Sequence, residues 1–124
     1  MSRPMPAVRG GRNIAMKVPP HTWDATVAFY RDVLGLKPIT GHAPETGFEF
    51  GANQLWIDRA PGLSQSEIWL QVATDDIEAT RARLEAANVV RCDDIEPLGE
   101  GAESFWILSP ASIVHLVSPE EREW

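Results

Sequence analysis

Two different periods order the hydrophobic residues in the first part of the chain. Over residues 13–18 apolar and polar side chains alternate, which predicts a strand with one buried face. Over residues 22–34 the apolar side chains recur at helical spacing, which predicts an amphipathic helix. Thr22 is the expected N-cap of this helix, and Gly35 can adopt the left-handed conformation that ends it. Because the apolar stripe is wide and aromatic, we expect the helix to pack on a sheet.

Short alternating runs follow the helix and predict the other strands of this half. The run at 37–40 is expected to be an edge strand, because Pro38 cannot donate a hydrogen bond to a neighbour on both sides. The runs at 47–50 and 54–58 flank a glycine-containing turn and predict a hairpin. The segment 60–66 then breaks the pattern with proline, glycine and serine, and we interpret it as a linker.

The same order of elements returns after the linker. Three apolar positions of the first strand recur at a constant offset of 54 residues, Ile14, Met16 and Val18 as Ile68, Leu70 and Val72. Asp76 is placed to cap a second helix that runs to about Ala87. Further strands are expected at 89–91, 104–108 and 113–117. The repeat predicts an α+β fold of two βαβββ modules, which form a curved mixed sheet around a concave cavity with the helices on the outer face.

The length of 124 residues fits a single domain. We expect that domain to cover residues 13–118. The expected parts are a flexible N-terminal arm at 1–12, module one at 13–59, the linker at 60–66, module two at 67–118 and a C-terminal tail at 119–124.

Charge and composition restrict the classes of partner. The net charge of −7 disfavours nucleic acid and acidic membrane surfaces, which both attract basic patches. The chain has no apolar run of the roughly 20 residues that span a bilayer, and residues 1–12 lack the apolar stretch of a secretory signal. The single Cys92 fits a reducing compartment, so a cytoplasmic location is expected. Asp93 and Asp94 should raise the pKa of this thiol and make it unreactive.

The side chains opposite the helix-facing positions are expected to line the cavity, and several of them carry chemistry. On the first strand of each module these are Asn13, Ala15 and Lys17, and Glu67, Trp69 and Gln71. On the closing strands they are Gln54, Trp56 and Asp58, and Ile113, His115 and Val117. Glu49 and Trp106 are further candidates for the binding site. Trp56 and Trp69 suit a flat or apolar small molecule, or a cation over a ring face, but a dimer interface would use them equally well. Trp106 is either a cavity residue or a core residue, because the alternation along its strand fits either face of the sheet. Glu67 and His115 form either an acid–base pair or a polar pair that satisfies itself.

The paired modules and the phrase Phe29–Leu36 (FYRDVLGL) resemble the vicinal oxygen chelate superfamily. That superfamily includes glyoxalase I, extradiol dioxygenases, fosfomycin-resistance enzymes, methylmalonyl-CoA epimerase and the bleomycin-resistance proteins. The resemblance covers about residues 12–118 and implies a homodimer. These residues form the end of a helix and a turn and are not catalytic, so they do not indicate which of these activities the chain has.

The resemblance also implies where a metal would be bound. The corresponding positions here are Asn13, Trp56, Glu67 and His115. Asparagine is a weak neutral ligand and tryptophan cannot ligate, which leaves Glu67 and His115, with Glu49 or Asp58 as further donors. A catalytic metal usually has three protein ligands.

Two main hypotheses about function follow from these residues. In the first, the protein binds a small aromatic or cationic molecule in a tryptophan-lined cavity and has a degenerate metal site. In the alternative it is a metal-dependent lyase, isomerase or dioxygenase that acts on a substrate with vicinal oxygens, and a divalent ion is its cofactor. Metal-free acid–base catalysis by Glu67 and His115 is a third hypothesis.

Overall fold

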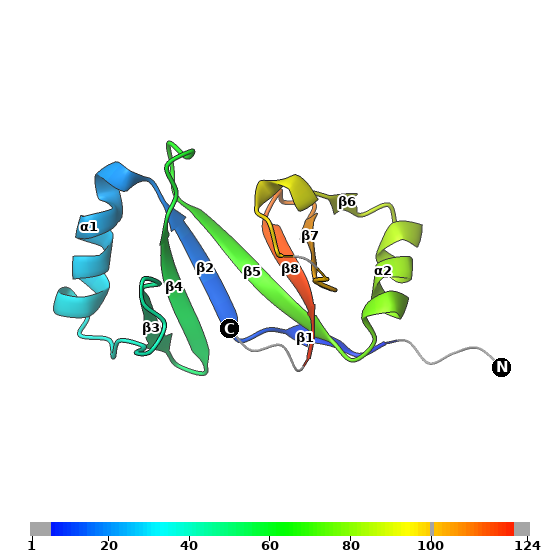
Figure 1. The fold of residues 1–124 in the computed structure, drawn as a ribbon, viewed down its shortest axis with the longest axis horizontal. Coiled ribbons are helices and arrows are strands. Elements are labelled where there is room, and N and C mark those ends of the chain that lie inside the picture. The colour runs from blue at the N-terminus through cyan, green and yellow to red at the C-terminus, as the bar shows by residue number, and fades with distance from the viewer. Residues whose placement is uncertain (1–5, 100, 121–124) are drawn as a thin grey trace. The chain divides into compact units, whose positions relative to one another are not determined.

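The structure is a computed structural model that describes residues 6–99 and 101–120 (Figure 1). The chain divides into two compact units. The first unit is Arg12–Trp69, and the second is Met1–Gly11 together with Leu70–Trp124.

The first unit contains a mixed sheet in the order β3-β4-β2-β5. Its strands are β2 (Asn13–Val18), β3 (Gly47–Phe50), β4 (Asn53–Arg59) and the first residues of β5 (Glu67–Thr74). The pair β2–β4 is parallel, whereas β3–β4 and β2–β5 are antiparallel. The expected strand at 37–40 is reduced to a single bridge between Pro38 and Phe48, because proline has no N–H to extend the ladder.

Helix α1 (Pro20–Ala28) covers one face of this sheet (Figure 1). The buried core between them consists of Val18, Val27, Phe48, Leu55 and Ile57. Partly buried Ile14 and Met16 pack against this core, so the predicted helix-facing side of β2 is confirmed.

The ends of the first helix differ from the prediction. The helix begins at Pro20, whose fixed φ suits the first turn, and its N-cap residue Pro19 makes no side-chain cap hydrogen bond. Thr22 is therefore not the N-cap; its hydroxyl donates to the Pro19 carbonyl at 3.4 Å. The last turn is a π-helix, η1 (Phe29–Val33), which no sequence pattern indicated. Gly35 has the predicted left-handed conformation, with φ of 68°.

The second unit repeats this plan. Its strands follow the order β5-β8-β7-β6, with β1 (Val8–Gly10) paired to β5. The remaining elements are α2 (Ile77–Ala86), β6 (Val90–Arg91), the 3₁₀ turn η2 (Asp93–Ile95), β7 (Phe105–Leu108) and β8 (Val114–Pro119). Its core consists of Phe105, Ile107 and Val117, against which Val72, Ile77, Leu84 and Val89 pack. Asp76 caps α2 as predicted, since its carboxylate accepts from the Ala79 N–H at 3.0 Å.

The second half has the order β5-α2-β6-β7-β8, which is βαβββ, and the first half has this order with one strand reduced to the Pro38–Phe48 bridge. The described residues form an α+β fold with a mixed sheet of eight strands. Residues 8–10 belong to the expected flexible arm but form β1, because β5 offers them a free edge; Gly11 N–H continues the pairing to the Gln71 carbonyl at 2.7 Å. Among the described residues no helix has the length and apolar character needed to cross a membrane.

Candidate binding face of the first unit

Two tryptophans lie in one row across the sheet of the first unit. Ala15 on β2 pairs with Trp56 on one side and with Trp69 on the other, and Trp56 also pairs with Gly47. Side chains of residues in register share a face of the sheet. Since the neighbouring positions Leu55 and Ile57 face α1, this row lies on the face away from the helix. We call Gly47, Trp56, Ala15 and Trp69 the tryptophan row.

The indole of Trp56 is fixed by three neighbours. Its Nε1–H donates to Asn13 Oδ1 at 2.7 Å. Its ring lies against Gly47, where an added Cβ would stand 2.5 Å from ring atom Cε3. The His42 ring meets its edge, with 5.3 Å between the ring centroids. The small residues on either side, Gly47 and Ala15, leave room for the ring to lie flat on the sheet.

Trp69 is held by charged neighbours. Its Nε1–H donates to Glu67 Oε1 at 2.9 Å. The Lys17 ammonium lies 4.2 Å from the centroid of its ring, within the range of a cation–π interaction. Both tryptophans are buried, with 6% of Trp56 and 9% of Trp69 exposed.

A charged row runs beside the tryptophan row. Lys17 pairs in register with Asp58 on β4 and with Glu67 on β5, and we call these three residues the charged row. Lys17 Nζ lies 2.9 Å from Asp58 Oδ2, with the lysine side chain 7% exposed and the aspartate side chain 31% exposed. The Asp58 carboxylate and the Trp69 ring thus both stabilise the buried ammonium. The prediction that Lys17 faces the side opposite the helix is confirmed by these pairings.

The other predicted residue of this unit, Glu49, is exposed. It pairs in register with Gln54 and forms an ion pair with Lys37, with 3.5 Å between Nζ and Oε2. It therefore stands at the edge of the face, away from both rows.

In the second unit, Gln71 and Trp106 are buried on the sheet face away from α2. Gln71 Nε2 donates to Ser118 Oγ at 3.0 Å, and Trp106 Nε1 donates to the Glu96 carbonyl at 2.9 Å. Both residues pair in register with Leu116, and they alternate with Val72 and Ile107, which belong to the core under α2.

His115 faces the other way from what the sequence predicts. It pairs with Ile107 on β7 and with Leu70 on β5, and Ile107 belongs to the core under α2. His115 thus lies on the α2 side, as does Val117, and its Nδ1 is 3.0 Å from the Ile113 carbonyl oxygen. The prediction that His115 and Val117 face the cavity is wrong. Glu67 and His115 belong to different units, so their action as a pair stays a prediction.

Comparison with solved structures gives consistent matches. The chain is similar to the Mn(II)-bound glyoxalase from Novosphingobium aromaticivorans, at 24% identity over 96% of this chain and a TM-score of 0.64, and it spans 43% of that longer chain. It is similar to methylmalonyl-CoA epimerase from Mycobacterium tuberculosis, at 16% identity over 89% of this chain and 87% of that one, with a TM-score of 0.57. A glyoxalase/bleomycin resistance protein/dioxygenase superfamily member from Vibrio splendidus 12B01 matches at 14% identity over 90% and 97%, with a TM-score of 0.55.

The chain has the vicinal oxygen chelate fold. The architecture expected from the FYRDVLGL phrase and the repeat is thereby confirmed. No family model and no curated protein matches the sequence.

Three of the four residues at which the resemblance implies a metal, Asn13, Trp56 and His115, are not placed to ligate one with the others. The Asn13 side-chain oxygen already accepts a hydrogen bond from Trp56, which itself cannot ligate. His115 lies on the α2 side of its sheet. In residues 6–99 and 101–120 no three His, Cys, Asp or Glu side chains form a group that could hold a metal.

Sequence reasoning placed Ala15 on this face but missed two other residues. Gly47 and His42 shape the surroundings of Trp56 without carrying polar chemistry of the expected kind. A glycine at the first position of a strand, opposite a tryptophan, was the one signal that could have indicated the close contact.

Proposed function

We propose that the protein binds small aromatic molecules at the tryptophan row, without a metal ion. The observation that supports the proposal most is that Trp56 and Trp69 flank Ala15 in register on the face away from α1. Two indoles separated by one small side chain offer large apolar surfaces at the spacing of a sheet, and such surfaces recognise flat ligands.

The charges beside the tryptophan row favour an uncharged aromatic ligand. The charged row has two carboxylates and one ammonium, so it would repel an anion. The ring face of Trp69 already carries the Lys17 ammonium at 4.2 Å, and a second cation there would be repelled. This changes the sequence expectation, which included a cation over the ring. A ligand must also open the contacts that bury both indoles, so binding should change their emission.

A set of nitrobenzyl compounds tests the proposal, because nitroaromatics quench indole fluorescence on contact. Chelator-treated protein is titrated with 4-nitrobenzyl alcohol, 4-nitrobenzoate and 4-nitrobenzylamine. We expect saturable quenching by the uncharged alcohol and weaker quenching by the two charged compounds. The amine is measured in the Trp23→Phe variant, so that Trp23 on the α1 side does not contribute to the signal. Trp56→Phe and Trp69→Phe should weaken the saturable part, whereas Trp23→Phe, which removes an indole bonded to the Ile57 carbonyl near α1, should leave the affinity unchanged. Linear quenching that never saturates would refute the proposal.

The metal-dependent alternative draws support from the Mn(II)-bound glyoxalase among the solved structures. Its donor set would have to come from residues other than Asn13 and Trp56. Elemental analysis of protein purified without chelator, and again after incubation with Mn²⁺, decides between the two. Stoichiometric manganese that survives dialysis would favour the enzyme, and its absence in both samples would favour metal-free binding.

The homodimer and the cytoplasmic location belong to this proposal as well. Light scattering after size-exclusion chromatography checks the homodimer, because the expected mass is twice 13.7 kDa. A mass of one chain at all concentrations would contradict it.

A further inference from the structure

A cavity lies in the first unit beside α1, and Gly47 is the one member of the tryptophan row in its lining. Its volume is about 370 Å³, which is within the range of small-molecule sites. We call this cavity the α1 groove. It is lined by Trp23, Asp24, Val27 and Arg31 from the helix, and by Pro38, Ile39, Glu45, Thr46, Gly47 and Phe48 from the segment that follows.

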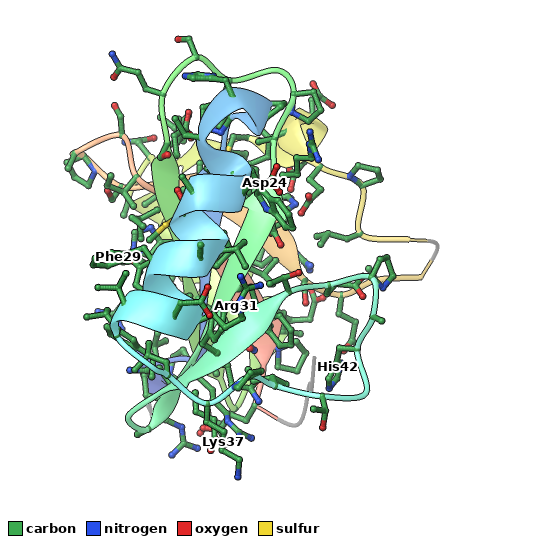
Figure 2. The ribbon with its side chains drawn as sticks, turned by 90° about the vertical axis from the view of Figure 1, so that its left-hand side faces the viewer. Asp24, Phe29, Arg31, Lys37 and His42 are labelled. Atoms are coloured by element: carbon green, nitrogen blue, oxygen red, sulfur yellow. The ribbon has the colours of Figure 1, made fainter. Side chains whose placement is uncertain are left out.

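The helical wall of the groove consists of α1 and its π-helical last turn η1, which carries Arg31. Asp24, Val27 and Arg31 recur at the spacing that places side chains along one side. Figure 2 shows Asp24 and Arg31 on the flank of α1 toward the loop that carries His42, and Phe29 on the other flank.

The floor of the groove is apolar and well packed. Phe48 and Val27 are 2% and 7% exposed and belong to the core. The backbone of the opposite wall is already bonded, since Ile39 N–H donates to the Gly47 carbonyl at 2.9 Å and the Thr46 carbonyl accepts from Ile57 N–H at 2.8 Å. The groove therefore offers an apolar floor, and a ligand's polar group would meet side chains at the rim.

The charge at the rim is negative. Arg31 is balanced by Asp32, with two N–H donors each 2.9 Å from a carboxylate oxygen. Asp24 and Glu45 are exposed, and within the described part of the chain neither side chain has a hydrogen bond or an ion pair. Two uncompensated carboxylates thus stand over an apolar floor.

We propose that the α1 groove binds a small organic cation with an apolar body, such as an arylalkyl ammonium ion. The apolar body would lie on Val27 and Phe48, and the ammonium would lie between Asp24 and Glu45. The tryptophan row is expected to bind uncharged aromatic molecules, so the charge of the ligand should distinguish the two sites. The proposal does not depend on binding at the tryptophan row.

Amide chemical shifts of the ¹⁵N-labelled full chain test this proposal. The protein is titrated with 4-phenylbutylammonium and, separately, with 4-phenylbutyrate, which has a similar apolar body and the opposite charge. We expect the ammonium to shift amides of residues 23–31 and 38–48 in a saturable manner, and the butyrate to bind there at least several-fold more weakly. Added salt should weaken the binding of the ammonium, because the rim charges are exposed.

Charge-removing variants supply the matched control. The double variant Asp24→Asn, Glu45→Gln should bind the ammonium roughly fivefold more weakly, since exposed charge pairs each contribute modestly. Glu85→Gln makes the same kind of change at an exposed position of α2 and should bind as the parent does. Equal binding of the two probes, shifts confined to other residues, no saturable shift, or an equal loss in Glu85→Gln would each overturn the proposal.

Discussion

Replacing Gly47 by alanine adds one methyl group at the most crowded point of the tryptophan row. The new Cβ would stand 2.5 Å from Cε3 and 2.8 Å from Cζ3 of Trp56, closer than such atoms approach in proteins. The indole cannot simply move aside, because its Nε1–H is bonded to Asn13 and only 6% of the residue is exposed. The backbone of Gly47 is not left-handed, so crowding is the sole direct cost.

The expected loss of stability is a balance of two terms. Overpacking costs about 1–3 kcal/mol. Reduced freedom of the unfolded chain offsets about 0.4–1 kcal/mol of this cost. We therefore expect Gly47→Ala to lower the free energy of unfolding by about 1–2 kcal/mol.

Urea denaturation followed by circular dichroism measures this difference. Gly62→Ala is the matched control, because nothing lies within 4 Å of its added Cβ and its backbone is not left-handed. The control should be neutral or slightly stabilising. If Gly47→Ala is as stable as Gly62→Ala, Trp56 does not lie against Gly47 and the geometry of the row is wrong.

Three further predictions concern charge, capping and the thiol. Asp58→Asn removes a partner from a buried ammonium and should cost about 2 kcal/mol, more than Lys17→Met, which removes the buried charge itself; urea midpoints in the reverse order would contradict this. Asp76→Ala removes the cap of α2 and should cost about 1 kcal/mol in the same assay, whereas an unchanged midpoint would show that the cap contributes nothing. Burial, and after it the charge of Asp93, raises the pKa of the Cys92 thiol. At a pH equal to the ordinary thiol pKa, iodoacetamide should therefore alkylate Cys92 of the folded protein more slowly than it alkylates a free thiol. The difference between the two rates should become smaller as pH rises. Because the neutral thiol is favoured in the folded state, its contribution to stability is full below the ordinary pKa and is lost as pH rises through the raised value.

The first unit was largely predictable because its strands have one clear apolar face. Ile14 and Met16 alternate with polar neighbours, so the side of β2 away from the helix could be assigned, and Lys17 lies there. The positions of Trp56 and Trp69 followed from the same alternation.

The second unit was less predictable because β8 is buried on both faces. Val114, Leu116 and Val117 are all buried, so alternation of apolar and polar residues does not show which way His115 points. A shift of phase by one residue moves every side chain to the other face. The pairing of His115 with Ile107 shows on which face of the sheet the His115 side chain lies. The π-helical end of the first helix depends on backbone hydrogen bonds that residue periodicity does not encode.

Indole N–H signals of the ¹⁵N-labelled, chelator-treated protein test the central claim most directly. The N–H groups of Trp56 and Trp69 each donate to a side-chain acceptor, at 2.7 Å and 2.9 Å, so a ligand on the tryptophan row should disturb both signals together. With 4-nitrobenzyl alcohol we expect these two signals to shift along one saturation curve, while the signal of Trp23 stays in place. Unmoved signals of Trp56 and Trp69, or shifts that appear only after a divalent metal is added, would contradict metal-free binding at this face.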